Sequence, residues 1–368
     1  GGTVADDDAI IYTIASNQVN AIRFMAAGRT LIIGTAGGEF TVSGGGDNDA
    51  VTPTNILIKK QSNHGAANID AVAVANATLF VQRAKRKLRE LAYNFDVDGY
   101  IAPDLTILAE HVTDGGIVEM AYQEEPLAII WCVRNDGELV ALTYQREQEV
   151  VAWHRHKFGG TFGSGDSATG FGVCESVAVI PTEDSEYELY MIIKRTINGA
   201  TKRYVEFLNT FDFDESDNTS FNFLDSQLSY SGSAATTISG LSHLEGQTVS
   251  ILADGATHPD KTVSSGSITL DRSATDVKVG LGYTSLLKTM RIDAGAQNGT
   301  SQAKTKRIYE VTARLYESVG VEIGPDLSNM ERVPFRTSSD PMDQGIPPFT
   351  GDKEVEFRGN YDTDGFMI

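Results

Sequence analysis

The chain has 368 residues, with 30 basic against 50 acidic side chains and a formal net charge of -20. Apolar residues make up 41% and charged residues 22%, a balance typical of a globular chain with a substantial core and room for two or three domains. Because tight binding to DNA or to anionic membranes needs clustered Lys and Arg, the acidic balance argues against both activities.

The cysteines and the chain ends exclude further classes of protein. Cys132 and Cys174 cannot form a disulfide framework and neither stands in a Cys-x-x-Cys pair, so we expect free buried thiols rather than the one bridge that two cysteines allow. No run of about 18 apolar residues marks a membrane helix, and Gly1–Asp8 lacks the regions of a signal peptide. The chain begins without Met and stops in the strand-like Asp364–Ile368, which favours a fragment of a longer soluble protein.

An internal repeat organises the first part of the chain. The 36 Gly and only 10 Pro, with abundant Thr, Val, Ile and Ser, predict many short strands joined by tight turns. Four apolar runs start at residues 31, 79, 128 and 189, at spacings of 48, 49 and 61 residues, and each is the middle strand of a three-part unit. The middle strands are Leu31–Thr35, Leu79–Gln82, Ala128–Val133 and Leu189–Ile193. The strands before them are Val19–Phe24, Ile69–Val74, Ile117–Tyr122 and Glu175–Ile180. The strands after them are Glu39–Val42, Leu91–Phe95, Glu138–Tyr144 and Arg203–Phe207.

The turns and outer strands of the repeat indicate its architecture. Ala26–Arg29, Asn135–Gly137 and Asn198–Gly199 contain the Gly and Asn that supply positive φ where hairpins require it. Glu149–His154 adds a fourth, outer strand to the third unit. Four-stranded antiparallel units that repeat at this period are typical of β-propeller blades, which cover one another's faces. On the repeat alone, a β-sandwich is the alternative.

One segment departs from strand periodicity. In Asp104–Val112 the apolar residues at 105, 108, 109 and 112 follow helical spacing and Asp104 can cap, which predicts a short helix. Arg83–Glu90 also has a helix-like start, but the apolar alternation from Leu91 to Val97 favours a strand there.

The composition changes after about residue 210. Phe211–Asn218 is an acidic, turn-rich bridge, and from Tyr230 to Asp293 very short strands alternate with Ser, Gly and Thr; these strands are Thr248–Leu252, Ser267–Leu270 and Val277–Gly280. The tail alternates again through Ile308, Val311, Ala313 and Leu315, and then reaches the Pro-rich residues 334–348. We therefore expect an all-β chain: N-terminally incomplete propeller blades over residues 1–228, an inserted small β-barrel over 229–293, and a C-terminally truncated return to the propeller or a platform over 294–368.

The histidines give one candidate metal-ligand pair. His154 and His156 share a strand face at i and i+2, but no third ligand lies nearby in the sequence, so we interpret them as structural residues of an outer strand beside Trp153. The other histidines are His64, His111, His243 and His258.

Three charged stretches have the composition of ion sites without their spacing. Asp96–Gly99 and Asp212–Asp217 bring carboxylates together, but neither matches a calcium-binding loop, so we expect solvated turn acids. Arg83–Arg89 holds five cations, and in so acidic a chain we expect a turn that pairs with acidic neighbours rather than a phosphate site.

Local motifs for catalysis and nucleotide binding are missing. Ser164 is not in a nucleophile elbow, because Phe162 and Asp166 stand where the two glycines are needed. Gly44–Gly46 and Gly280–Gly282 lack the third Gly at the required spacing and the following helix of a nucleotide-binding fold. Carboxylate pairs of glycosidases come from distant loops and leave no local signature. We predict no catalytic, cofactor-binding or metal-binding residues and no cofactor.

Four stretches of the chain are similar to one family. They are Asp104–Val112, Leu142–His154, Ile193–Gly199 and Gly240–Val249, and they resemble the tail nozzle proteins of short-tailed bacteriophages, also called tail tubular protein B. The resemblance spans Val19–Phe357, and residues 230–290 are similar to a small β domain likened to one in ubiquitin-activating enzymes. That segment contains no Cys, so ubiquitin chemistry does not follow.

The resemblance implies a non-enzymatic virion protein that assembles in the host cytoplasm. Its subunits would form a ring, of six in this family, below the portal and adaptor, around the channel through which DNA leaves, and would offer lateral surfaces to tail fibres. An acidic channel wall would let DNA pass without specific binding, because it lacks the cations that make binding tight. Two alternatives are a propeller glycosidase or tail depolymerase, and a host-receptor binder with exposed aromatics, for which Trp153, Tyr283 and Tyr361 are the first candidates.

Overall fold

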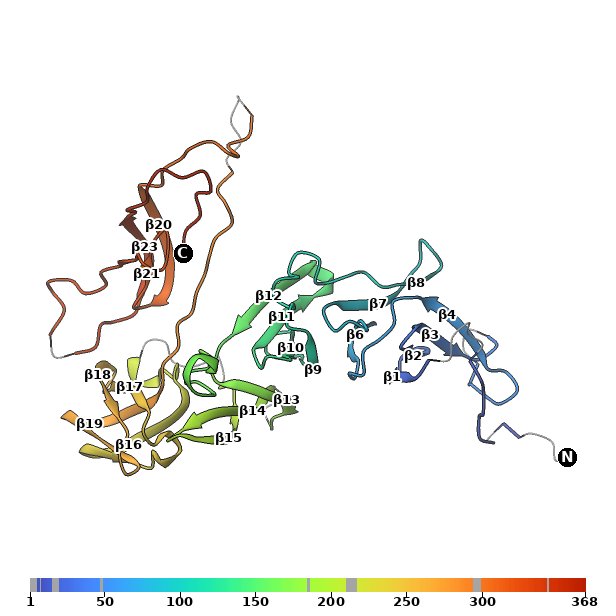
Figure 1. The fold of residues 1–368 in the computed structure, drawn as a ribbon, viewed down its shortest axis with the longest axis horizontal. Helices are drawn as coiled ribbons and strands as arrows, with labels where there is room; N and C mark the ends of the chain where they lie inside the picture. Colours follow the sequence, from blue (N-terminus) through green and yellow to red (C-terminus); the bar gives the residue numbers. More distant parts are fainter. Residues whose placement is uncertain are drawn as a thin grey trace. The chain divides into compact units, whose positions relative to one another are not determined.

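The computed structural model describes residues 5–6, 8–14, 20–46, 49–183, 186–209, 217–293, 299–342 and 344–368. Over these ranges the chain is nearly all β and contains no α-helix, which confirms the all-β prediction (Figure 1). The chain divides into two compact units, the first formed by Gly1–Thr196 with Thr201–Asn209 and the second by Ile197–Ala200 with Thr210–Ile368.

The first unit consists of four antiparallel sheets in chain order. Within each sheet, every strand pairs with the next one along the chain. The first sheet is β1 (Ile22–Ala26), β2 (Leu31–Thr35), β3 (Gly38–Ser43) and β4 (Leu57–Ser62). The second is β5 (Val72–Val74), β6 (Ala77–Val81), β7 (Leu88–Asn94) and β8 (Gly99–Ile101). The third is β9 (Ile117–Gln123), β10 (Ile129–Arg134), β11 (Leu139–Gln145) and β12 (Val150–His156), with the 3₁₀ turn η1 (Arg146–Gln148) before β12. The 3₁₀ turn η2 (Gly165–Ser167) precedes the fourth sheet, β13 (Val173–Pro181), β14 (Tyr187–Ile197) and β15 (Ala200–Phe207).

The twelve strands of the predicted repeat all exist, with ends shifted by a few residues. Val19, the first residue predicted for β1, lies outside the described residues. The outer strand predicted from Glu149 is β12, and the strand favoured after Arg83–Glu90 is β7, which ends at Asn94. Phe95 and Val97 are instead exposed in the following turn. The repeat is therefore confirmed as a series of antiparallel meanders.

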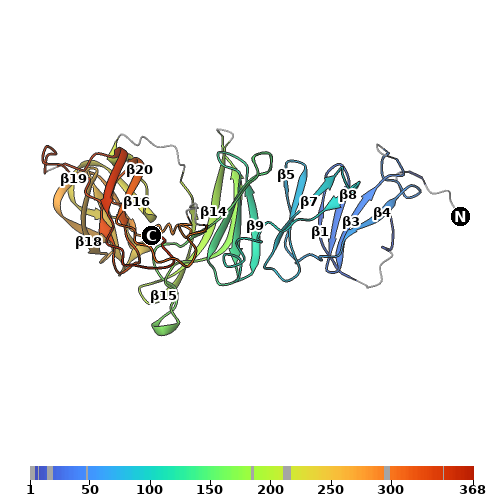
Figure 2. The same cartoon turned by 90° about the horizontal axis from the view of Figure 1, so that it is seen from above.

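The middle strands explain the apolar runs because both of their faces are covered. In β10, Ile130 and Cys132 belong to a core shared with the second sheet. The alternate residues Ile129, Trp131 and Val133 belong to a core shared with the fourth sheet. A strand covered on both faces needs no polar side, which is why its sequence is continuously apolar. Consecutive sheets thus stack face to face through shared cores (Figure 2).

Glycine at the β10–β11 hairpin is required by both conformation and space. Gly137 has a φ of +83°, and a Cβ there would lie 2.2 Å from Cγ1 of Val173. Asn198 and Gly199 also have positive φ, as predicted for the β14–β15 hairpin, whereas Gly28 is not among the positive-φ residues.

Replacing Gly137 by Ala is expected to lower the free energy of unfolding by about 2–4 kcal/mol, the combined cost of a left-handed backbone and of overpacking. The matched control is Gly199→Ala, where φ is +71° and no atom lies within 4 Å of the added Cβ. This control should lose only about 1 kcal/mol, the backbone contribution alone. Urea denaturation measures both losses, and equal losses would contradict the steric contribution.

The helix predicted for Asp104–Val112 is wrong. The segment forms consecutive turns, in which the amide of Ala109 donates to the carbonyl of Thr106 and that of Val112 donates to Ala109. Asp104 does bind a nearby amide, but as a turn residue, since its Oδ1 accepts from the Thr106 amide at 2.9 Å. The backbone of Leu105 also donates to the carbonyl of Leu88 in β7, so this segment is held by the sheet rather than by a helical ladder.

The second unit contains a four-stranded sheet in the order β16-β19-β17-β18. Its elements are η3 (Asn218–Ser220), β16 (Asp225–Ser239), η4 (Ser242–Leu244), β17 (Thr248–Ala253), β18 (Ala256–Thr262) and β19 (Ser267–Leu281). The prediction of very short strands is wrong here, because Ser267–Leu270 and Val277–Gly280 are the two ends of the single strand β19. Ala274, in the polar stretch between them, is buried and pairs with Ala235 of β16, which keeps the strand continuous.

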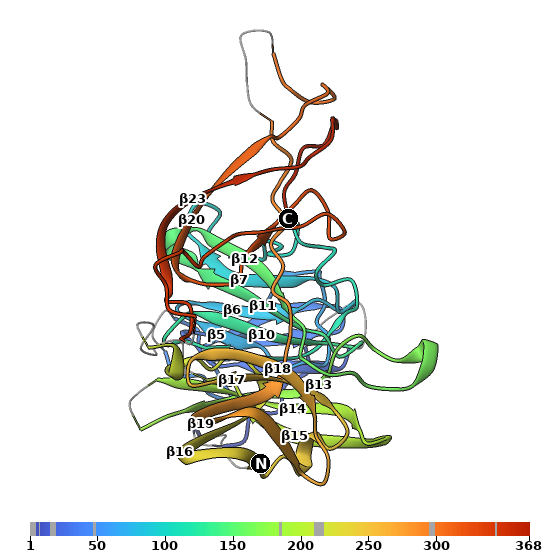
Figure 3. The same ribbon diagram turned by 90° about the vertical axis from the view of Figure 1, so that its left-hand side faces the viewer.

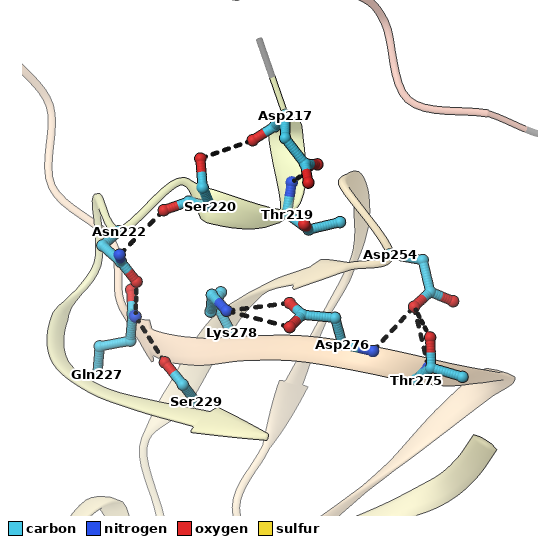
Figure 4. A network of polar contacts seen from close by, with 10 residues as sticks. All are labelled: Asp217, Thr219, Ser220, Asn222, Gln227, Ser229, Asp254, Thr275, Asp276 and Lys278. Atoms are coloured by element: carbon cyan, nitrogen blue, oxygen red, sulfur yellow. Dashed lines mark hydrogen bonds and ion pairs between the residues drawn. The ribbon is translucent and has the colours of Figure 1, made fainter. Parts of the chain in front are cut away.

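Polar contacts fix the turns around this sheet (Figure 4). Oδ1 of Asp254, in the β17–β18 turn, accepts from the amides of Thr275 and Asp276 in β19, each at 2.9 Å. Asp217 caps η3 through the Thr219 amide at 2.9 Å. Since carboxylates that accept backbone amides hold a turn in one geometry, these residues serve the fold of the unit.

The remaining strands are β20 (Glu310–Ser318), β21 (Glu322–Ile323), β22 (Glu331–Arg332) and β23 (Phe349–Glu356). β20 pairs with β23 (Figures 1 and 3), and β21 pairs with β22. As predicted, the tail alternates, and Leu315 packs with a small core of Val333, Phe335 and Val355.

Candidate functional site

The most distinctive feature of the first unit is a loop, residues 104–112, held by side chains from distant strands. Nε1 of Trp153 donates to the carbonyl of Leu105 at 2.9 Å, and Nη2 of Arg155 donates to the carbonyl of His111 at 2.6 Å. Nη1 of Arg134 donates to the carbonyl of Val112 at 2.9 Å. Loop 104–112 and β12 therefore lie side by side, although the contacting residues are 44 and 48 positions apart in the sequence.

A partly buried carboxylate, Asp104, anchors the start of loop 104–112. Asp104 accepts from Nζ of Lys87 at 2.8 Å and from the amide of Thr106 at 2.9 Å. Burial opposes ionisation of Asp104, but these donors outweigh it and hold its pKa below the usual value. Lys87 also pairs with Glu110 at 3.5 Å, so one cation ties both parts of the loop to the second sheet.

The tip of loop 104–112 is apolar and exposed. Ile107 is 69% exposed and Leu108 is 92% exposed, whereas Thr106 and Ala109 on either side are buried. The helical spacing that groups Leu108 with residues 105, 109 and 112 therefore does not describe its position, since Ala109 and Val112 are buried and Leu108 is not. Large apolar side chains held out from a rigid base are typical of contact surfaces for other proteins.

His154 and His156 are joined by a hydrogen bond. Nδ1 of His154 lies 2.7 Å from Nε2 of His156, and Nε2 of His154 lies 3.1 Å from Oγ1 of Thr143. The ring of Trp131 contacts both imidazoles, with centroid distances of 6.4 Å to His154 and 5.0 Å to His156. Burial lowers the pKa of both, that of His156 to about 4 with help from the neighbouring His154.

This arrangement predicts a loss of stability on acidification. Both imidazoles are neutral in the folded chain above pH 6.5, so the folded state keeps its full stability there. As the pH falls from 6.5 toward 4, the unfolded chain binds protons that folded His156 does not, and the free energy of unfolding falls by about 1–3 kcal/mol. Urea denaturation at pH 7 and pH 4.5 measures it. His156→Gln should reduce the pH dependence, and an unchanged pH dependence in that variant would contradict the assignment.

The other histidines do not join this pair. His111 is exposed, and Nε2 of the buried His258 accepts from the Asp271 amide at 2.9 Å. His243 contacts the carbonyl of Ser226, and burial lowers the pKa of His64. Within the described part of the chain, no group of three or more His, Cys, Asp or Glu side chains is arranged to hold a metal ion.

The cysteine prediction is confirmed. Cys132 and Cys174 are free and buried. Burial raises the pKa of each thiol to about 12, which keeps both protonated and unreactive at neutral pH.

Two of the three charged stretches have the local roles that the sequence predicted. Asp96 and Asp98 are exposed in the β7–β8 turn, where Asp98 accepts from the hydroxyl of Tyr93. In the basic stretch, Arg86 pairs with Asp114 and Lys87 pairs with Asp104. Asp212–Ser216 lies outside the described residues.

The motif candidate Ser164 and the aromatic candidates are distributed over the two units. Ser164 immediately precedes the 3₁₀ turn η2, whose three residues are not buried. Trp153 packs against the core between the second and third sheets, as expected for a structural residue. Tyr283 is 48% exposed and Tyr361 is 74% exposed, in the second unit.

One cavity in the first unit has carboxylates in its wall. It has a volume of about 470 Å³ and is lined by the β10–β11 hairpin, the start of β13 and the loop from Phe162 to Thr169. Its Glu175 accepts from Arg203 and Lys194, and these bonds lower its pKa to about 2. Its Asp136 pairs with Arg134 at 2.5 Å. A glycosidase needs one carboxyl with a raised pKa, and Glu175 has the opposite.

Two features that depend on the tertiary fold were not predicted from the sequence. One is the exposed tip at Ile107 and Leu108, for which Pro103 before the loop and Gly115–Gly116 after it were the available signals. The other is the ion pair between Arg195 of β14, which is fully buried, and Glu206 of β15. No local signal marks it, because the two residues meet only through strand pairing.

Neither a membrane-spanning helix nor a related protein points to a function for the described part of the chain. Over the described ranges, no helix is long and apolar enough to cross a lipid bilayer. A scan against protein-family models and a search of curated proteins both found no match to this chain.

Proposed function

We propose that this chain is a non-enzymatic structural part of a bacteriophage tail nozzle, a subunit of a ring around the DNA-ejection channel with lateral surfaces for tail fibres. The observation that carries the proposal is the series of stacked antiparallel meanders, whose middle strands are buried on both faces. Such a stack is rigid and its loops are free to vary, which suits a protein whose work is to hold other proteins in place.

Within this proposal the four meanders are blades of a β-propeller, and residues 229–293 form the inserted small β-barrel. The three four-stranded sheets and their face-to-face packing support the blade assignment. The separate core of residues 238–281 supports an independent inserted domain. Residues 1–228 and 294–368 are then the incomplete propeller and its return or platform.

Within this proposal, the net charge of -20 explains why DNA would move through the channel without binding to its wall. A wall rich in carboxylates repels DNA phosphates and makes no multiple cationic contacts, so the genome passes without being held. The portal, adaptor and tail-fibre proteins are the other proposed partners, in a virion assembled in the host cytoplasm.

Electron microscopy of the purified full-length protein tests the ring. The expected result is closed rings of six subunits at physiological salt. A protein that stays monomeric at all concentrations, or that cleaves host polysaccharide, would overturn the nozzle assignment and favour a depolymerase or receptor binder.

Loop 104–112 supplies a variant for the same test. Ile107→Asn with Leu108→Asn should disrupt ring formation, since apolar side chains this exposed contribute most when they are buried against a partner. The free energy of unfolding should change by less than about 0.5 kcal/mol, because the monomer does not bury these groups. The control Val205→Asn removes a 73% exposed apolar residue from β15. Rings that form normally with the loop variant would contradict a contact role for this tip.

A further inference from the structure

The His154 and His156 pair has a geometry that sequence spacing alone did not reveal. The two residues lie on one face of β12, and the ring atoms that face each other are both nitrogens, Nδ1 and Nε2, 2.7 Å apart. Two nitrogens that bind one tetrahedral Zn²⁺ at 2.0–2.1 Å stand about 3.3 Å apart. A shared ion therefore requires the two nitrogens to separate by about half an ångström and the rings to turn until both lone pairs point at the ion.

Thr143 sets the tautomer that such an ion needs. When Nε2–H of His154 donates to Oγ1 of Thr143, 3.1 Å away, Nδ1 of His154 carries a lone pair and accepts from Nε2–H of His156. Metal binding then requires the Nε2 proton of His156 to move, through solvent, to Nδ1 of the same ring, which frees the Nε2 lone pair. Metal-bound imidazoles are usually oriented in this way, by a hydrogen bond from the other ring nitrogen. Thr143 lies opposite Ala152 on the neighbouring strand, so β-sheet pairing fixes its position.

The surroundings keep both imidazoles neutral. Both rings are half-buried against Trp131, and none of the ion pairs of the described residues includes either one. Arg155, between them in the sequence, is engaged with the carbonyl of His111. A neutral imidazole with an available lone pair is the form that binds metal.

We propose that Nδ1 of His154 and Nε2 of His156 chelate one divalent transition-metal ion, of the Zn²⁺ class, with Thr143 as a positioning residue and water completing the coordination. The ion would replace the hydrogen bond as the link between the two side chains of the outer strand. The proposal does not depend on the nozzle assignment.

Calorimetric titration of the full chain with Zn²⁺ at pH 7.5 tests the site. The expected result is one saturable site per chain, lost in His154→Gln and in His156→Gln and retained in the control His111→Gln, whose imidazole is exposed and distant from the pair in the sequence. Thr143→Val should weaken binding by about tenfold, as loss of an orienting partner does. Equal Zn²⁺ binding in all the variants, or no saturable site in the wild type, would overturn the proposal.

A second measurement uses the wild-type protein alone, so it does not depend on whether a variant folds. In the ¹⁵N NMR spectrum of histidine-labelled wild-type protein, Zn²⁺ should shift one ring nitrogen in each of two histidines, Nδ1 in one and Nε2 in the other. Unchanged ring-nitrogen shifts, or shifts confined to one histidine, would contradict chelation by the pair.

Discussion

Replacing Arg195 by Met is expected to lower the free energy of unfolding of the first unit by about 3–5 kcal/mol. The side chain of Arg195 is fully buried, with Nη1 and Nη2 on the carboxylate of Glu206 and Nε donating to the carbonyl of Gly159 at 2.8 Å. Without the guanidinium, Glu206, whose side chain is only 15% exposed, keeps a charge with no buried partner, and the Gly159 carbonyl loses the Arg195 donor.

Two variants separate this charge effect from a loss of packing. The double variant Arg195→Met with Glu206→Met should recover a large part of the lost stability, because no unpaired charge remains. Arg203→Met removes a half-exposed cation on β15 and should have a far smaller effect, since exposed ion pairs contribute little. Guanidinium denaturation followed by tryptophan fluorescence measures all three. A loss of less than about 1 kcal/mol in Arg195→Met would refute the account of a structural ion pair.

Replacing Trp131 by Ala is expected to destabilise the first unit by about 3–5 kcal/mol, the usual cost of removing a large aromatic residue from a core. Trp131 is 1% exposed in the core between the third and fourth sheets, and it contacts both imidazoles of the histidine pair. Its Nε1 donates to Oε1 of Gln123 at 2.9 Å, and Nε2 of Gln123 donates to the carbonyl of Tyr187 at 2.6 Å. The variant thus leaves both a cavity and an unpaired amide oxygen.

The matched control for Trp131 is Val151→Ala on β12, a 46% exposed apolar residue in the same sheet. It should change the free energy of unfolding by less than about 1 kcal/mol. Far-UV circular dichroism during denaturation checks both variants and does not depend on the tryptophan signal. Similar losses in the two variants would show that the interface between these sheets contributes little to stability.

The repeat could be predicted because its signals are local. A middle strand such as β10 is apolar throughout because two sheets cover it, and the hairpin after it has Gly137 where a left-handed residue is required. Each of these features is determined by fewer than about ten consecutive residues, which is the range over which hydrophobic pattern and turn chemistry act.

Loop 104–112 could not be predicted for the opposite reason. Its apolar spacing fits a helix, but its conformation is decided by Trp153, Arg155 and Arg134, which bind its carbonyls from other strands. Those contacts bridge 22 to 48 residues of sequence, so no local window contains them. The same holds for β19, where burial of Ala274 overrides a polar stretch that has the composition of a turn.

The histidine pair shows the limit of spacing arguments about a site. The sequence indicated that His154 and His156 share a face, and the strand β12 bears this out. Which ring nitrogens face each other depends on side-chain rotamers set by Trp131 and Thr143, and these come from two other strands.

Cryo-electron microscopy of intact virions tests the central claim most directly, because it locates the protein that contains this chain in the particle. The account predicts that the stacked meanders fit density in a ring coaxial with the portal, around the DNA channel, with acidic side chains toward the duplex. Density for this chain in peripheral appendages, or a continuous basic band on the channel wall, would contradict it.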